Sequence, residues 1–164
     1  MRKMILALVV AVLASGTAAA TDKTDVMAVV HQFVDGFNKG DVKSALATCA
    51  DNVVILDDFA PHVWDGAGAC AKWASDFDAD SKKTQTTEGV VAIGKPRHLD
   101  VTGDRAYVVL PAGYTYKVAG KPMQNTGSVW TLALQKTGAG WRITGWAWAG
   151  GKESPVTTKA NSFS

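Results

Sequence analysis

Residues 127–149 have the sequence GSVWTLALQKTGAGWRITGWAWA, and this stretch decides the fold. Its two arms alternate and are rich in aromatic and branched side chains, while residues 136–140 supply turn-forming types, which is the pattern of a β-hairpin. Three of the six tryptophans lie in the second arm, at Trp141, Trp146 and Trp148. Large aromatic side chains carry much of the buried area of a core. We therefore expect this hairpin at the centre of a curved antiparallel sheet, with one face covered by other elements.

Three segments before the hairpin have the pattern of helices. Apolar residues recur at three- and four-residue spacing over residues 25–39, which predicts a long amphipathic helix that ends at Gly40. Residues 41–50 and 66–78 predict two shorter helices. These helices are expected to cover the apolar face of the sheet.

Short apolar or alternating runs at 53–56, 88–93, 98–101 and 106–118 predict the other strands, and residues 59–65 predict an irregular connector. Helices that precede a strand meander are typical of the α+β class. Residues 21–152 are expected to form a single domain, because this length can enclose one core. Residues 153–164 predict a flexible C-terminal tail, since they have little to bury.

The first twenty residues have the features of a secretory signal peptide. Arg2 and Lys3 precede an apolar run, and Ala18 to Ala20 form a small-residue cleavage site. We expect cleavage after Ala20 and export to the periplasm or the medium. The apolar run is too short to span a bilayer, and no other segment has the roughly 20 apolar residues that a span requires.

Charge argues against a nucleic-acid partner. The formal net charge of +2 comes from 17 basic and 15 acidic residues, and two of the basic residues lie in the leader. The remaining chain is therefore near neutral, which gives nucleic-acid binding no electrostatic support.

Cys49 and Cys70 are the only two cysteines in the chain. An even pair in an exported protein predicts a disulfide. The alternative is a pair of small buried thiols on neighbouring helices. Two cysteines without suitably spaced histidines make a poor metal site, and residues 76–87 lack the glycine and glutamate of a calcium loop. No metal or cofactor is expected.

Four short motifs follow one another along the chain: Phe37 to Asp41, Cys49 to Asp51, Trp64 to Gly66 and Trp141 to Ile143. In this order they resemble the motifs of the NTF2-like superfamily, and in particular of its SnoaL-like and ketosteroid-isomerase-like members. The resemblance covers nearly the whole chain after the leader. It implies a cone in which a curved antiparallel sheet wraps the long first helix, with two shorter helices and an apolar pocket at the open end.

The same resemblance places the catalytic base of ketosteroid isomerases on Asp57. In that chemistry a carboxylate moves a proton next to a carbonyl while two donors stabilise the enolate oxygen. Here the tyrosine donor is replaced by Phe33 and the second donor falls near Thr131, so one donor is absent and the other is a weak hydroxyl. Asp57 is alternatively a strand-end carboxylate that accepts backbone hydrogen bonds. Asp57 and Asp58 are neighbours on a predicted strand, so at most one should face the pocket.

Aromatic side chains complete the expected pocket. Tyr114 and Tyr116 share one sheet face, as do Trp146 and Trp148, and alignment with the family puts both pairs on the concave side. Core packing is the alternative for each. The expected ligand-binding residues are Phe33, Asp57, Phe59, Trp73, Tyr114, Tyr116, Thr131, Trp146 and Trp148. His62, in the connector, is a further candidate proton carrier, although a lone loop histidine is more often solvated.

The sequence therefore predicts an exported protein that binds a small hydrophobic molecule in an aromatic pocket, with Asp57 at the polar end. One alternative is an isomerase- or cyclase-type enzyme in which Asp57 is the general base. Another is a non-catalytic association module. A homodimer through the outer sheet face is also expected, because strands such as 129–134 are apolar on both faces.

Overall fold

The computed structural model describes residues 14–156, with side chains described from residue 21. Most of the predicted signal peptide, residues 1–20, lies outside this range, so its cleavage stays a prediction. No helix in the described part of the chain is long and apolar enough to cross a membrane.

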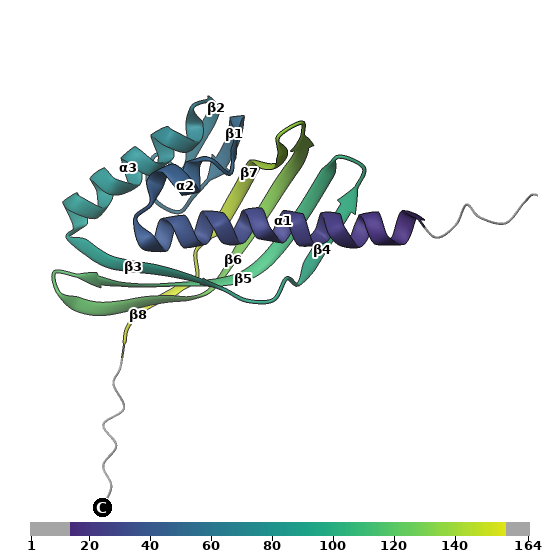
Figure 1. Ribbon diagram of the computed structural model, residues 1–164. Helices are drawn as coiled ribbons and strands as arrows, with labels where there is room; N and C mark the ends of the chain where they lie inside the picture. Colours follow the sequence, from purple (N-terminus) through teal and green to yellow (C-terminus); the bar gives the residue numbers. More distant parts are fainter. Residues whose placement is uncertain (1–13, 157–164) are drawn as a thin grey trace, which may run out of the picture.

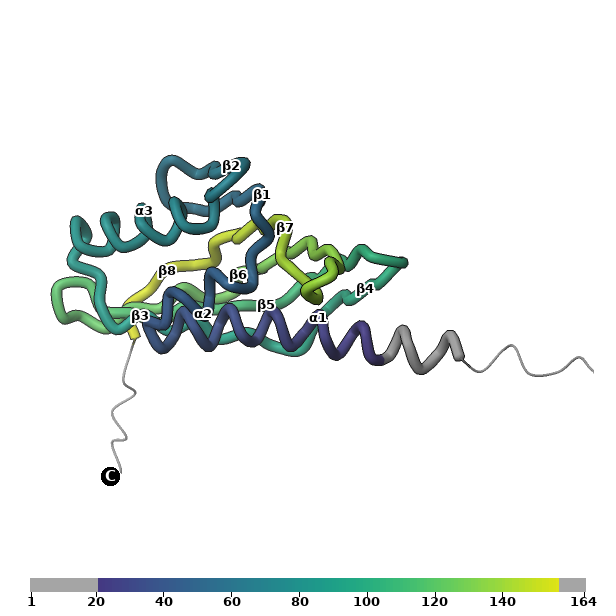
Figure 2. Tube along the Cα trace, turned by 45° about the horizontal axis from the view of Figure 1, so that its top comes forward, coloured from purple at the N-terminus to yellow at the C-terminus, as the bar shows by residue number. Residues whose placement is uncertain are grey.

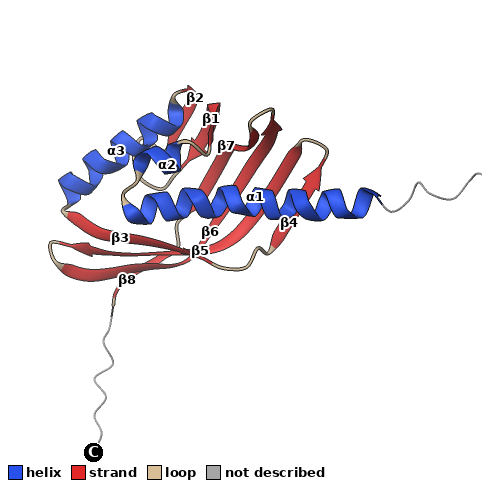
Figure 3. Ribbon diagram, viewed as in Figure 1, coloured by secondary structure: helices blue, strands red, loops and turns tan. Residues whose placement is uncertain are grey.

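Three helices and eight strands make up the described chain (Figure 3). The helices are α1 (Ala14–Lys39), α2 (Val42–Leu46) and α3 (Ala69–Thr84). The strands are β1 (Cys49–Leu56), β2 (Val63–Ala67), β3 (Thr86–Ile93), β4 (His98–Thr102), β5 (Arg105–Val118), β6 (Lys121–Thr137), β7 (Gly140–Ala149) and β8 (Lys152–Pro155). The predicted α+β class is confirmed.

All strands join one curved sheet, in the order β2-β1-β7-β6-β5-β3, with β4 paired to β5 and β8 paired to β6. Strands β1 and β7 are parallel, whereas the other pairs are antiparallel. The expectation of a purely antiparallel sheet is therefore wrong, and the sheet is mixed. A tight turn forces antiparallel pairing, but β1 and β7 are joined by a long connection that leaves their relative direction free.

The predicted hairpin is confirmed as β6 and β7. Thr137 pairs with Gly140 at the turn, and Trp130 pairs with Trp148. Gly145 lies where β7 meets β1, and a Cβ atom there would come within 2.9 Å of the Val54 carbonyl oxygen. Glycine at this position therefore permits the close approach of the parallel strand.

Helix α1 crosses the concave face of the sheet (Figure 1), and the tube view shows the sheet curling beside it (Figure 2). Its apolar side is the predicted one: Val26 and Val30 are fully buried, and Phe33 and Val34 nearly so. These residues pack with the inward side chains of the sheet, which include Ile55, Leu110, Leu132 and Ile143. The helix ends before Gly40, which has a φ of +67°. The expected cone around a long first helix is confirmed.

Three local predictions differ from the structure. The second helix is shorter than residues 41–50, because Cys49 already starts β1. The third helix spans Ala69–Thr84 instead of residues 66–78. Residues 63–67, which overlap the predicted irregular connector, pair with β1 as β2. Residues 63–67 have the sequence VWDGA, in which apolar and polar residues do not alternate, so the usual sequence pattern of a half-buried strand is absent.

The tail prediction is wrong for residues 153–155. They belong to β8, which pairs with Met123 to Thr126 of β6. A segment rich in lysine, glutamate, serine and proline has low strand propensity, so its extended form depends on the partner strand. Residues 157–164 lie outside the described part of the chain.

The predicted disulfide is present between Cys49 and Cys70, with a Cα–Cα distance of 6.5 Å. It joins β1 to the start of α3, not helix to helix as expected. The bridge fixes the helix that forms one wall of the cavity described next.

Candidate functional site

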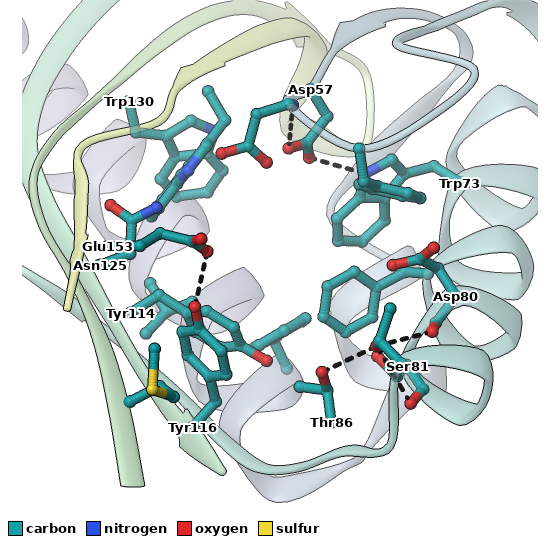
Figure 4. Close-up of a pocket in the computed structure, with 18 of the residues that line it drawn as sticks. Asp57, Trp73, Asp80, Ser81, Thr86, Tyr114, Tyr116, Asn125, Trp130 and Glu153 are labelled. Atoms are coloured by element: carbon teal, nitrogen blue, oxygen red, sulfur yellow. Dashed lines mark hydrogen bonds between the residues drawn. The ribbon is translucent and has the colours of Figure 1, made fainter. Parts of the chain in front are cut away.

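A cavity of about 520 Å³ opens between α1, α3 and the strands β3, β5, β6, β7 and β8 (Figure 4). Ten aromatic side chains form most of its walls: Phe33, Phe37, Phe59, Trp73, Phe77, Tyr114, Tyr116, Trp130, Trp146 and Trp148. They come from both helices and from the long strands, so the cavity is a product of the whole cone.

Trp73 on α3 packs against aromatic side chains of both α1 and α3 in the cavity wall. Its ring centroid lies 6.0 Å from that of Phe33 on α1 and 5.6 Å from that of Phe77 on α3, with Trp146 edge-on at 5.2 Å. Aromatic pairs at 4.5–7 Å stabilise a core beyond their buried area. The tryptophan and its neighbours therefore form a rigid wall.

Asp57 brings a half-buried carboxyl group into this wall. Its Oδ2 accepts a hydrogen bond of 2.9 Å from the Trp73 indole N–H, and its Oδ1 accepts one of 2.8 Å from the Asp58 backbone N–H. Burial raises the pKa of Asp57 from its ordinary value of 3.8 to about 7, and the negative charge of Asp58 adds to this rise. The two hydrogen bonds favour the charged form of Asp57, so they reduce the rise in its pKa. The carboxyl group thus titrates near neutral pH.

Asp58 also lines the cavity, which contradicts the prediction that at most one of the pair does so. The prediction assumed an extended strand, but β1 ends at Leu56 and the chain turns at once. The Asp57 N–H bonds to the His62 carbonyl, 3.0 Å away, and closes this turn. The Asp58 carboxylate lies against Gly150, where a Cβ atom would overlap its Oδ2.

Two tyrosines form the wall opposite α3. Tyr114 and Tyr116 stack with centroids 4.8 Å apart. The Tyr116 hydroxyl donates a 2.6 Å hydrogen bond to Glu153, and burial together with this acceptor raises the Tyr116 pKa above its usual range. Burial raises the pKa of Tyr114 to about 12. Its hydroxyl packs against Gly89, at which any Cβ would overlap it. Both phenols are therefore neutral donors at physiological pH.

Eight of the nine expected ligand-binding residues line the cavity, and Thr131 does not. Thr131 lies on β6 between Trp130 and Leu132, whose side chains are buried on the inner face. Because side chains alternate along a strand, Thr131 points to the outer face. The inward residue at this level is Trp130. His62 does not line the cavity either; its ring lies 3.2 Å from the Asp57 carbonyl oxygen on the exposed side.

Sequence reasoning missed Glu153, because it lay in the predicted tail. Its strand is held by Asn125, whose buried Oδ1 accepts hydrogen bonds from the Ser128 hydroxyl at 2.7 Å and the Gly151 N–H at 2.8 Å. No local pattern in the sequence indicates these hydrogen bonds of Asn125. Asp80 on α3 was noted only as part of a rejected calcium loop, yet it also lines the cavity. Within residues 21–156, no three His, Cys, Asp or Glu side chains are arranged to hold a metal ion.

Comparison with known proteins gives one family match. The model of the SnoaL-like domain family matches residues 26–147, which is more than half of the chain. No curated protein matches the sequence.

Several solved structures share the fold at low identity. An NTF2-like protein from Novosphingobium aromaticivorans is 17% identical with a TM-score of 0.67, over 83% of this chain and 86% of its own. Hexachlorocyclohexane dehydrochlorinase LinA-type3 from Novosphingobium barchaimii is 10% identical with a TM-score of 0.66, over 87% of this chain and 91% of its own. A ketosteroid isomerase-like protein from Erwinia carotovora atroseptica is 16% identical with a TM-score of 0.58, over 84% of this chain and 98% of its own. At these identities the likeness establishes the fold alone.

Proposed function

The chain belongs to the SnoaL-like domains of the NTF2-like superfamily, and from this premise we propose that it binds a small hydrophobic molecule inside the cone. The observation that carries the proposal is an open aromatic cavity of about 520 Å³ with the half-buried Asp57 carboxyl group in its wall. Ligand sites typically enclose about 300–1,000 Å³ and combine apolar walls with a few polar groups. A pure association module would have no need for this hollow, because tryptophan and tyrosine side chains could fill it.

Binding is tested with N-phenyl-1-naphthylamine, a neutral dye that fluoresces in apolar sites. We expect saturable binding to the wild type and a loss of about tenfold or more in affinity for Val91→Phe, because the larger ring fills the cavity and removes apolar contact area. Val90 is the matched control: it is the neighbouring residue on β3, is 45% exposed and does not line the cavity. Equal dye binding by Val91→Phe and Val90→Phe would place the dye elsewhere and contradict the proposal.

A second candidate function is proton transfer by Asp57. The pKa near 7 favours it, since a general base is most effective when its pKa lies close to the working pH. The ionised carboxylate would take a proton from a carbon next to a carbonyl, leaving an enolate, and would then return the proton. Tyr114, whose hydroxyl has no hydrogen-bond partner among residues 21–156, is the available donor for the enolate oxygen. Two of the fold neighbours are a dehydrochlorinase and a ketosteroid isomerase-like protein.

The activity is tested by α-hydrogen exchange of 2-tetralone in D₂O, followed by NMR. Asp57→Asn should remove the protein-dependent rate, a loss on the order of 10²-fold or more. His62→Ala should retain it, because the His62 ring lies outside the cavity. Exchange that is equal in wild type and Asp57→Asn would refute the catalytic role and leave ligand binding untouched.

We also propose that the protein is exported. The leader-like residues 1–20 and the Cys49–Cys70 disulfide support this, because disulfides persist in oxidising compartments. Intact-mass measurement of protein from the periplasm of a Gram-negative host should give a chain that begins at Thr21. An unprocessed chain in the cytoplasm would contradict export.

A further inference from the structure

We propose that the ligand of this cavity is an organic cation, with an apolar body among the aromatic rings and a protonated amine or quaternary ammonium group facing the carboxylates. This inference rests on the proposed binding function and assigns the charge of the molecule that is bound.

The charged residues of the cavity are strongly unbalanced. Asp57, Asp58, Asp80 and Glu153 line it, against a single cation, Lys121. They come from different parts of the fold: two follow β1, one lies on α3 and one on β8. In Figure 4 the carboxyl groups of Asp57, Asp80 and Glu153 lie around the same open space. The excess of negative charge is therefore a property of the cavity, not of one acidic segment.

The four cavity carboxylates, like six of the eleven outside the cavity, form no ion pair among residues 21–156. Among residues 21–156, five carboxylates outside the cavity lie within 4.0 Å of a lysine or arginine: Asp22, Asp76, Asp78, Glu88 and Asp104. None of the four cavity carboxylates has such a partner in the same range. Glu153 and Asp57 accept hydrogen bonds only from neutral donors, Tyr116 and Trp73 among them.

A ligand that enters the cavity removes water from the carboxylates that it covers, of which Asp57 and Asp80 are already half-buried and Asp58 and Glu153 are exposed. Taking an ionised carboxylate out of water is costly unless a counter-charge or donors compensate. A neutral ligand supplies no counter-charge, and an anion adds repulsion. A cation supplies the counter-charge that compensates for this desolvation, and the aromatic walls offset the loss of its own hydration.

The walls favour the same class of molecule. Aromatic faces attract cations through their quadrupole, and aromatic cages are the usual receptors of quaternary ammonium groups. The stacked pair of Tyr114 and Tyr116 lies beside Glu153, so aromatic faces and a carboxylate are available to one positive group. The remaining aromatic walls accommodate the apolar body.

The charge is tested with an isosteric pair of probes. Benzyltrimethylammonium and neopentylbenzene have the same shape and differ in the charge of one atom, and benzenesulfonate supplies an anion. The affinity of each probe is measured by its displacement of N-phenyl-1-naphthylamine from the mature protein. We expect the cation to bind about tenfold more tightly than its neutral isostere, which lies between the scales of an exposed and a desolvated cation–π contact.

Matched variants identify the groups that hold the charge. Glu153→Gln keeps an acceptor for Tyr116, and Asp80→Asn keeps the shape of the α3 side chain; each should weaken the cation several-fold and leave neopentylbenzene unchanged. Asp78→Asn is the control, because Asp78 lies on the same helix, pairs with Lys82 and does not line the cavity. It should change neither affinity.

Equal or tighter displacement by neopentylbenzene or benzenesulfonate would overturn the charge assignment and leave the binding function standing. The charge assignment would also be overturned if Asp78→Asn lost the preference for the cation as Asp80→Asn does. The preference would then depend on the charge of the protein surface and not on the carboxylates of the cavity. If the dye itself does not bind, the proposed function fails and this inference fails with it.

Discussion

Replacing Asp57 with asparagine should destabilise the protein at low pH and stabilise it at neutral pH. The folded protein raises the pKa of Asp57 from 3.8 to about 7, mainly by burial. The folded state therefore holds the proton more tightly than the unfolded chain. The stability that this proton contributes is complete below pH 3.8 and is lost as the pH rises to about 7.

The size of the effect follows from the shift. A difference of roughly three pKa units, at about 1.36 kcal/mol each, corresponds to about 4 kcal/mol. Asparagine does not titrate and so avoids this loss. The amide oxygen of asparagine can still accept the hydrogen bond from the Trp73 indole. The amide NH₂ group then replaces Oδ1 and cannot accept the hydrogen bond from the Asp58 N–H. The loss of this bond costs about 1 kcal/mol. Asp57→Asn should thus be about 1 kcal/mol less stable than wild type below pH 4 and about 3 kcal/mol more stable above pH 7.

The assay is urea unfolding of both proteins at several pH values between 4 and 8 and at constant ionic strength. Taking the difference in the free energy of unfolding between the two proteins removes the contribution of every group that titrates alike in both. Asp78→Asn is the control, because it removes a surface carboxylate and should shift stability by about 0.5 kcal/mol or less, with no reversal. If Asp57→Asn is less stable than wild type by a constant amount across the range, the carboxylate is ionised and structural, and our reasoning about its burial is wrong.

Four further predictions concern the frame around the cavity. Replacing Cys49 and Cys70 by serine should lower the free energy of unfolding by about 3 kcal/mol without unfolding the protein; unchanged urea midpoints would contradict this. Asn38→Ala should cost about 2 kcal/mol, because the side chain makes two 2.8 Å hydrogen bonds to the β3 backbone, and a loss below about 0.5 kcal/mol would show that water replaces them. Gly145→Ala should cost about 1–3 kcal/mol through overpacking against Val54, and a neutral result would mean that β1 moves freely. Sedimentation at micromolar concentration should give a dimer; a monomer alone would count against the outer sheet face as an interface.

Local patterns in the sequence were sufficient for the elements that form from neighbouring residues. The alternation and turn of 127–149 predicted the β6–β7 hairpin, and the spacing of apolar residues predicted the buried side of α1. Strand and helix periods are properties of the backbone, so they can be recognised without knowing the partners. The same periods put Tyr114 with Tyr116 and Trp146 with Trp148 on a shared face, and the resemblance to the family put both pairs on the concave side, where they line the cavity.

The tertiary structure decided what depends on segments far apart in the chain. The parallel pairing of β1 with β7, and the addition of β8 with Glu153 to β6, leave no local pattern, because each pairing joins segments far apart in the chain. The end of β1 at Leu56 turned both Asp57 and Asp58 into the cavity. The pKa of Asp57 and the unpaired charge around it arise only when the cone removes that carboxyl group from water, since desolvation is set by everything that surrounds a group and not by its neighbours in sequence.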